Sequence, residues 1–79
     1  MITIYGTSFC GDCMRSKRYL ESKNIEFKYI NIEDNEELIS LVQKLNNGMQ
    51  SVPTIVFPDG SVLTEPSNSE LAKKLESIN

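Results

Sequence analysis

The chain contains no histidine and no tryptophan, and only two of its 79 residues are cysteine. A structural zinc ion is usually held by four cysteine or histidine side chains, so an intramolecular zinc site is not expected and we predict no bound metal. Two cysteines allow a single disulfide, which is too few for a disulfide-rich scaffold. Most of the stability must therefore come from a sheet covered by helices.

Basic residues are not in excess either. The sequence has 8 lysines and arginines against 11 aspartates and glutamates, a formal charge of -3, whereas nucleic acids and anionic membranes favour basic partners. No segment resembles a signal peptide or is long enough to span a bilayer, and there is no repeat, linker or low-complexity tract. We therefore expect one domain over residues 1–79, a monomer in the cytoplasm, with proteins or small thiols as partners.

Hydrophobic periodicity and turn signals predict seven elements. The strands are expected at 1–5, 25–32, 52–57 and 61–64, and the helices at 14–23, from about 35 to 46, and from about 67 onwards. Three apolar helix faces follow from the three-to-four-residue spacing. Their members are Cys13, Ser16 or Lys17, and Leu20 in the first helix; Leu38, Leu41, Val42 and Leu45 in the second; and Leu71, Leu75 and Ile78 in the third.

This β-α-β-α-β-β-α order predicts an α/β fold in which a four-stranded mixed sheet is flanked by three helices. A right-handed crossover makes the first two strands parallel. The turn Pro58-Asp59-Gly60 makes the last two an antiparallel hairpin.

Cys10-Gly11-Asp12-Cys13 stands where the first strand gives way to the first helix. Unpaired backbone N–H groups and the helix dipole favour a thiolate at that point, so Cys10 is the candidate nucleophile. Cys13, one turn further on and facing the core, is suited to resolving a mixed disulfide. The alternative is the chance placement of two inert thiols, but the strand-to-helix context favours a redox pair.

The charged residues around the cysteines can be interpreted either as part of the site or as ordinary helix surface. Gly11 lets a substrate approach closely, and the Asp12 carboxylate opposes thiolate formation while Arg15 and Lys17 partly offset it. Alternatively, Asp12 is a first-turn acid that stabilises the helix start, and Arg15 and Arg18 belong to a solvated helix face.

Pro53 precedes an apolar strand and could simply begin an edge strand. A cis Val52-Pro53 bond would instead leave the Val52 backbone free to pair with an extended substrate beside Cys10. The residues alone favour the first interpretation.

Five segments match a known pattern in the right order: Ile4-Tyr5, Thr7-Ser8-Phe9-Cys10-Gly11-Asp12-Cys13, Phe27-Lys28-Tyr29-Ile30-Asn31-Ile32, Ser51-Val52-Pro53-Thr54 and Asp59-Gly60. Together they resemble the glutaredoxin branch of the thioredoxin superfamily. The mycoredoxin-like glutaredoxins within it are resembled through Thr7-Ser8-Phe9-Cys10-Gly11, Arg15, Val52-Pro53-Thr54-Ile55-Val56-Phe57, Asp59-Gly60-Ser61, Leu63-Thr64 and Pro66-Ser67, and redoxins that reduce ribonucleotide reductase are close relatives. The resemblance implies a thioredoxin-like fold of the glutaredoxin type, Cys10 as nucleophile and Cys13 as resolving thiol. It also implies a cis Pro53 and an aromatic ring at Phe9 that shields the disulfide.

The sequence departs from glutathione-using members of that branch. Thr7 and Gln50 stand where basic residues commonly lie near the carboxylates of glutathione, and Thr64-Glu65-Pro66-Ser67 replaces a Gly-Gly loop that offers backbone N–H groups. Pro66 has no N–H to give. No tightly bound cofactor is expected, and the electron donor is expected to be a low-molecular-weight thiol, either glutathione or a mycothiol-like one, or thioredoxin reductase. These departures favour a thiol other than glutathione, or the reductase.

The expected function is that of a dithiol-disulfide oxidoreductase that reduces protein disulfides or protein-thiol mixed disulfides, in electron transport and cell redox homeostasis. The expected substrate-binding residues are Phe9, Gly11, Asp12, Val52 and Pro53. Three alternatives stay open. They are an iron-sulfur carrier that binds its cluster through Cys10 and external thiols, a redoxin that serves ribonucleotide reductase, and a module used only for protein contacts.

Overall fold

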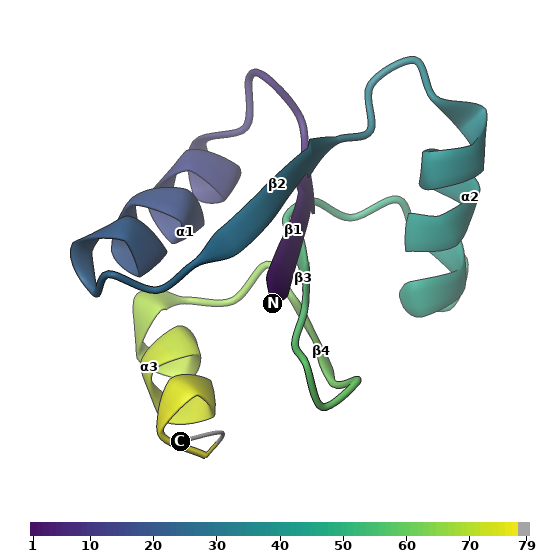
Figure 1. Cartoon of the computed structure of the whole chain (residues 1–79). Helices are drawn as coiled ribbons and strands as arrows, with labels where there is room; N and C mark the ends of the chain where they lie inside the picture. Colours follow the sequence, from purple (N-terminus) through teal and green to yellow (C-terminus); the bar gives the residue numbers. More distant parts are fainter. Residues whose placement is uncertain (78–79) are drawn as a thin grey trace.

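The computed structural model describes residues 1–77, and its seven elements follow one another in the predicted order (Figure 1). Helices α1 and α3 lie on one side of the sheet and α2 lies on the other (Figure 1). The elements are β1 (Ile2–Gly6), α1 (Gly11–Ser22), β2 (Phe27–Asn31), α2 (Glu36–Leu45), β3 (Thr54–Val56), β4 (Val62–Thr64) and α3 (Asn68–Ser77).

The four strands form one mixed sheet in the order β2-β1-β3-β4, which confirms the predicted fold class. Strand β1 pairs in parallel with β2, with Ile4 opposite Tyr29, and antiparallel with β3, with Ile4 opposite Ile55. Strands β3 and β4 form the predicted hairpin. Because β1 lies inside the sheet and ends at Gly6, the loop that follows it places the cysteines at that end of the sheet.

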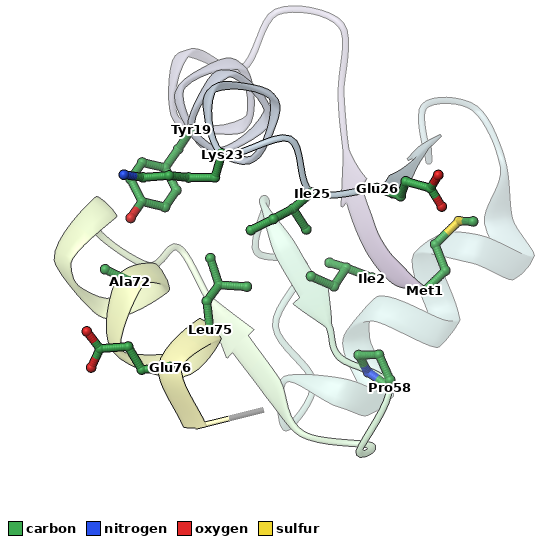
Figure 2. Close-up of a pocket in the computed structure, with 10 residues that line it drawn as sticks. All are labelled: Met1, Ile2, Tyr19, Lys23, Ile25, Glu26, Pro58, Ala72, Leu75 and Glu76. Atoms are coloured by element: carbon green, nitrogen blue, oxygen red, sulfur yellow. The ribbon is translucent and has the colours of Figure 1, made fainter. Parts of the chain in front are cut away.

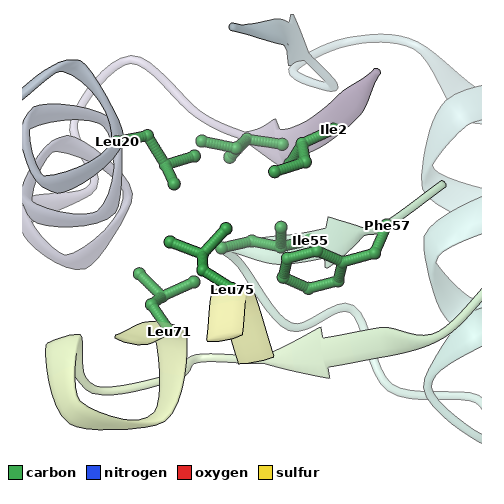
Figure 3. Packing of buried hydrophobic residues seen from close by; sticks show 7 residues of the cluster. Ile2, Leu20, Ile55, Phe57, Leu71 and Leu75 are labelled. Carbon is green, nitrogen blue, oxygen red and sulfur yellow. The ribbon is translucent and has the colours of Figure 1, made fainter. Parts of the chain in front are cut away.

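The main hydrophobic core fills the space between the sheet and the α1–α3 layer (Figure 3). On α1, the predicted face is confirmed by the burial of Cys13, Ser16 and Leu20. The core residues are Ile2, Ile4, Leu20, Ile55, Phe57, Leu71 and Leu75. Ile78, which the sequence predicts on the same face of the last helix, lies outside the described residues. Each side chain of this size contributes about 1.5–3 kcal/mol when fully buried.

The face that α2 turns toward the sheet differs from the predicted stripe. Val42 is fully buried, but Leu41 and Leu45 are 38% and 36% exposed. At 100° per residue, the less exposed positions Leu38, Ile39 and Asn46 surround Val42, so the helix is rotated away from Leu41 and Leu45. The polar Asn46 takes a place on that face, which periodicity based on apolar residues does not detect.

Several element boundaries also differ from prediction. Helix α1 already begins at Gly11, β2 is confined to Phe27–Asn31, and β3 begins only at Thr54. Pro53 lacks the N–H that a strand residue donates, so Val52 and Pro53 stay outside the sheet ladder. Within residues 1–77, no helix has both the length and the apolar composition that crossing a membrane requires.

Candidate active site

Cys10 and Cys13 form a disulfide at the start of α1, with their Cα atoms 5.1 Å apart. Cys10 is the N-cap of the helix: its backbone is extended, and its Sγ accepts a hydrogen bond from the Cys13 N–H at 3.0 Å. An N-cap acceptor satisfies one of the unpaired N–H groups of the first turn. The sulfur of Cys10 therefore lies where the helix favours negative charge.

The two sulfurs differ in exposure. Cys10 is half-buried, whereas Cys13 is fully buried on the face of α1 that packs toward the sheet. This confirms the predicted difference in position. One turn beyond Cys13, the buried Ser16 hydroxyl has no hydrogen-bond partner among residues 1–77.

Val52 and Pro53 come from the other half of the sequence to the side of Cys10. The Val52-Pro53 peptide bond is cis, as the resemblance implies, and the Val52 carbonyl oxygen lies 3.9 Å from Cys10 Sγ. A disulfide sulfur carries no hydrogen, so this is a contact in the oxidised protein; the thiol of the reduced protein has a hydrogen to donate there. The Val52 backbone is therefore next to the reactive sulfur.

Asn46, at the C-terminus of α2, holds this segment in place. Its Nδ2 donates to Val42 O at 3.0 Å and to Thr54 Oγ1 at 2.8 Å, and its Oδ1 accepts from the Thr64 hydroxyl. The buried Thr54 hydroxyl donates in turn to Ser51 O at 2.7 Å. The sequence marks Asn46 only as the end of a helix, and nothing in the local pattern indicates its contacts with both strands of the hairpin.

The Arg15 side chain is 37% exposed, and it also makes tertiary contacts that the solvated-face interpretation does not include. Its guanidinium donates to Pro66 O at 3.0 Å and to Asn68 Oδ1 at 2.9 Å, and lies 3.5 Å from the Asp12 carboxylate. It thereby links α1 to the start of α3 and places a positive charge beside Asp12. Lys17, the other cation expected near Asp12, lies over the Tyr29 ring instead.

Phe9 and Gly11 both lie open to solvent. The Phe9 side chain is 98% exposed, so the expected shielding of the disulfide by this ring is wrong for the structure. A loop residue between a strand end and an N-cap has no neighbouring element to pack against here. A Cβ added at Gly11 would meet no atom of the chain within 4 Å, so this side of the disulfide is free for a partner.

Tyr29 lies beneath the cysteine loop and was not singled out by sequence reasoning. Its hydroxyl donates to Thr7 O at 2.9 Å, and its pKa is raised by burial and by the nearby Glu33 carboxylate. Glu33, two residues beyond the end of β2, also accepts from Ser8 N at 2.6 Å, so the loop is held by β2 and by the segment that follows it. Tyr29 follows the period-two pattern of its strand, which predicts its face but not its contact with the loop.

The segment that replaces the Gly-Gly loop, Thr64-Glu65-Pro66-Ser67, has no free backbone N–H in its last three residues. Glu65 N donates to Pro53 O at 2.8 Å, Pro66 has no N–H, and Ser67 N donates to Glu70 Oε1 at 3.0 Å. Glu65 is exposed and adds a carboxylate. An anionic ligand therefore finds no free backbone N–H at these three residues.

A pocket of about 590 Å³ lies at the opposite end of β1 from the cysteines (Figure 2). Met1 and Ile2 line it together with the end of α1 and the C-terminal half of α3. None of the cysteines or of their neighbours described above reaches it, so its size does not make it the site of the redox chemistry.

Comparison with known proteins agrees with this geometry. A family model described as Glutaredoxin matches residues 2–63. A Mycobacterium tuberculosis protein named "putative glutaredoxin" is 43% identical over 77 residues, which cover 98% of this chain and 92% of the relative. Mycoredoxin 1 of Corynebacterium glutamicum is 31% identical over 77 residues, covering 98% and 95%.

Two further relatives extend the comparison. A glutaredoxin-like protein NrdH of Lactococcus lactis is 32% identical over 73 residues, covering 92% of this chain and 97% of the relative. The crystal structure of a glutaredoxin from Archaeoglobus fulgidus superposes with a TM-score of 0.80 at 25% identity, covering 94% of this chain and 84% of that one. Because the family match spans most of the chain and contains both cysteines, the chain belongs to the glutaredoxin family and is a thiol-disulfide oxidoreductase.

Proposed function

We propose that this enzyme reduces protein disulfides, and mixed disulfides between proteins and small thiols, by a two-cysteine mechanism in which Cys10 attacks and Cys13 resolves. The observation that carries the proposal is the unequal placement of the two sulfurs, one at the helix N-cap and half-buried, the other fully buried. A thiolate at Cys10 keeps the hydrogen bond from the Cys13 N–H, which favours the charged form.

The reaction balances with the groups at hand. The Cys10 thiolate attacks one sulfur of the target disulfide, and the other target sulfur leaves as a thiolate that takes up a proton. The Cys13 sulfur then attacks Cys10 Sγ, releases the second target thiol and closes the Cys10–Cys13 disulfide. The target gains two electrons and two protons, and the enzyme dithiol loses them.

The surroundings of Cys10 support binding of an extended substrate chain. The Val52 carbonyl lies 3.9 Å from Cys10 Sγ, Val52 is outside the strand ladder, and the space at Gly11 is open. A substrate backbone can pair with Val52 while its sulfur approaches Cys10. Pro53 follows Val52 in this segment, and the exposed Asp12 carboxylate and Phe9 ring are available to a partner.

Serine variants test the two roles. We expect Cys10→Ser to lose reduction of both insulin and a peptide-thiol mixed disulfide, since no other thiolate is exposed. We expect Cys13→Ser to lose insulin reduction but to retain reduction of the mixed disulfide when a small thiol is supplied. Full activity of Cys10→Ser in either assay contradicts the proposal.

We propose further that the electron donor is a low-molecular-weight thiol other than glutathione, or a flavoprotein reductase. The occupied or missing N–H groups at Glu65, Pro66 and Ser67 support this, as do Thr7 and Gln50 in place of basic residues. The experiment offers the oxidised enzyme glutathione, mycothiol, bacillithiol, or NADPH with thioredoxin reductase, and follows the recovery of free thiols. Fastest recovery with glutathione contradicts this part of the proposal.

The pairing of Cys10 with Cys13 also favours the redox role over an iron-sulfur carrier, because a neighbouring thiol competes with external ligands for Cys10. Anaerobic reconstitution is therefore expected to leave the protein colourless. A stable visible absorption band after reconstitution would support cluster binding instead.

A further inference from the structure

Gly6, the last residue of β1, marks a point where a side chain of β2 meets the buried cysteine of α1. A Cβ built at Gly6 would overlap the Tyr29 hydroxyl and would lie 2.9 Å from Cys13 Sγ. The hydroxyl and the sulfur therefore flank the same backbone position, which only the absence of a side chain at Gly6 makes possible. Tyr29 is brought there by the parallel pairing of β1 with β2.

The Tyr29 hydroxyl is a donor that can change partner. It donates to Thr7 O at 2.9 Å, on the loop that leads to the cysteines. Two charged groups face this tyrosine: Lys17 Nζ lies 5.7 Å from the centre of its ring, and the Glu33 carboxylate raises its pKa together with burial. The phenol thus keeps its proton throughout the neutral pH range.

Cys13 needs such a donor when the enzyme is reduced. The residue is fully buried, so water does not reach its sulfur, and burial of a thiol disfavours its charged form. A resolving thiol must nevertheless react as a thiolate. A hydrogen bond to the charged sulfur would offset the burial.

We propose that Tyr29 is a positioning residue for Cys13, whose hydroxyl turns from Thr7 O to Cys13 Sγ in the reduced enzyme and stabilises the resolving thiolate. This rests on the resolving role of Cys13 proposed above. In the step it assists, the Cys13 thiolate attacks Cys10 Sγ, the bond between Cys10 and the target breaks, and the departing target thiolate takes up the proton that Cys13 has lost. The phenol proton is shared with the sulfur and is not consumed.

The thiol of Cys13 can be titrated alone in a Cys10→Ser background by following thiolate absorbance in the ultraviolet. Tyr29→Phe removes a hydrogen bond to the charged sulfur and so is expected to raise the Cys13 pKa by about one unit or more. The matched control is Tyr5→Phe, which removes the hydroxyl of a half-buried tyrosine on the central strand β1. In Tyr5→Phe the Cys13 pKa should equal that of the Cys10→Ser parent. If Tyr29→Phe also leaves the Cys13 pKa equal to that of this parent, the proposal is overturned.

A kinetic measurement separates positioning from a purely structural role. In an enzyme with both cysteines, Tyr29→Phe should slow the release of product from a Cys10 mixed disulfide about threefold at neutral pH. A rise of one pKa unit leaves about tenfold less thiolate, which the greater nucleophilicity of that thiolate partly offsets. The rate of attack by Cys10 should not change. Equal slowing of the attack by Cys10 and of the product release by Cys13 overturns the proposal. The two-cysteine mechanism itself is tested separately, by insulin reduction with the unmodified enzyme.

Discussion

At the scale of single residues, Cys10 and Cys13 show how three positions of sequence produce two kinds of thiol. Cys10 caps the helix with its side chain directed at the first-turn N–H groups, whereas Cys13 lies one turn further on the buried face. Their reactivity differs because the helix end supplies donors to one sulfur and the core removes water from the other.

Two glycines near the disulfide should respond oppositely to alanine. At Gly6 the added methyl overlaps the Tyr29 hydroxyl and crowds Cys13 Sγ, so Gly6→Ala should lower the free energy of unfolding by about 1–3 kcal/mol. At Gly11 the methyl meets open space in the first turn of a helix, so Gly11→Ala should leave stability unchanged or raise it by up to about 1 kcal/mol. Urea unfolding of the oxidised variants measures both values, and equal stabilities would contradict the packing described around Gly6.

At the scale of elements, α3 depends on a reciprocal cap at its start. The Ser67 hydroxyl accepts from Glu70 N at 3.1 Å, and the Glu70 carboxylate accepts from Ser67 N at 3.0 Å. This is the capping box, which the serine followed three residues later by glutamate indicates in the sequence. Arg15 then holds the capped end of α3 against α1.

Loss of the cap should destabilise the fold by a modest amount. Ser67→Ala is expected to lower the free energy of unfolding by about 1 kcal/mol, because the Glu70 N–H loses its acceptor. Ser69→Ala, at an exposed position within the same helix, is the matched control and should cost nothing. Thermal or urea unfolding measures the stability of both variants. An equal loss of stability in Ser67→Ala and Ser69→Ala would contradict the role of the cap.

The β3–β4 hairpin is joined to α3 by an exposed carboxylate. Asp59 accepts from Lys74 Nζ at 2.7 Å, from the Ser61 hydroxyl at 2.6 Å and from Ser61 N at 2.9 Å, and these contacts hold its pKa far below the ordinary value. Lys74 also lies 5.5 Å from the centre of the Phe57 ring. The turn and the helix are therefore coupled through one charge pair.

This coupling predicts a dependence of stability on pH. Because the folded-state pKa lies below the unfolded value of about 3.9, the Asp59 contribution is complete above that pH and is lost as the pH falls through the folded pKa. The stability difference between the parent and Asp59→Asn should therefore be constant from about pH 7 to about pH 5 and should shrink below about pH 4. Asp34→Asn, which removes another exposed carboxylate, is the control. If the stability difference between the parent and Asp59→Asn grows in acid, the stabilising role given to the Asp59 contacts is contradicted.

At the scale of the whole molecule, the two sides of the sheet are packed unequally. The side covered by α1 and α3 contains the main cluster of buried hydrophobic residues (Figure 3), whereas α2 buries only Val42 completely and leaves Leu41 and Leu45 more than a third exposed. Less apolar area is removed from water on the α2 side.

Opening should therefore begin at α2. Native-state hydrogen exchange is expected to show that amides of α2 open at a lower free energy than those of β1 and α1. Because Asn46 connects α2 to Thr54 and Thr64, Asn46→Ala should lower the protection of α2 further. Uniform protection in all three elements would contradict this ranking.

Much of the architecture follows from local pattern. Alternating apolar residues, the Pro58-Asp59-Gly60 turn and the caps at Asn35 and Ser67 mark the elements in order, because each depends on neighbours a few residues away. The orientation of α2 did not follow, since a polar residue at position 46 takes part in its buried face. Local pattern does not predict the exposure of Phe9 either, because an aromatic residue in a loop is buried only if another element covers it.

By itself, the sequence determined the redox pair, its place at a strand-to-helix junction and the unequal positions of its thiols, since helix geometry decides where residues 10 and 13 lie. Only the tertiary structure decided that the Val52 carbonyl lies beside Cys10, that Arg15 joins α1 to α3, and that Tyr29 shares the space at Gly6 with Cys13. Val52 and Cys10 are 42 positions apart in the sequence, and Arg15 and Pro66 are 51 apart. Gly6 and Tyr29 lie on two different strands, β1 and β2. These contacts arise from strand register and helix packing, which no local periodicity specifies.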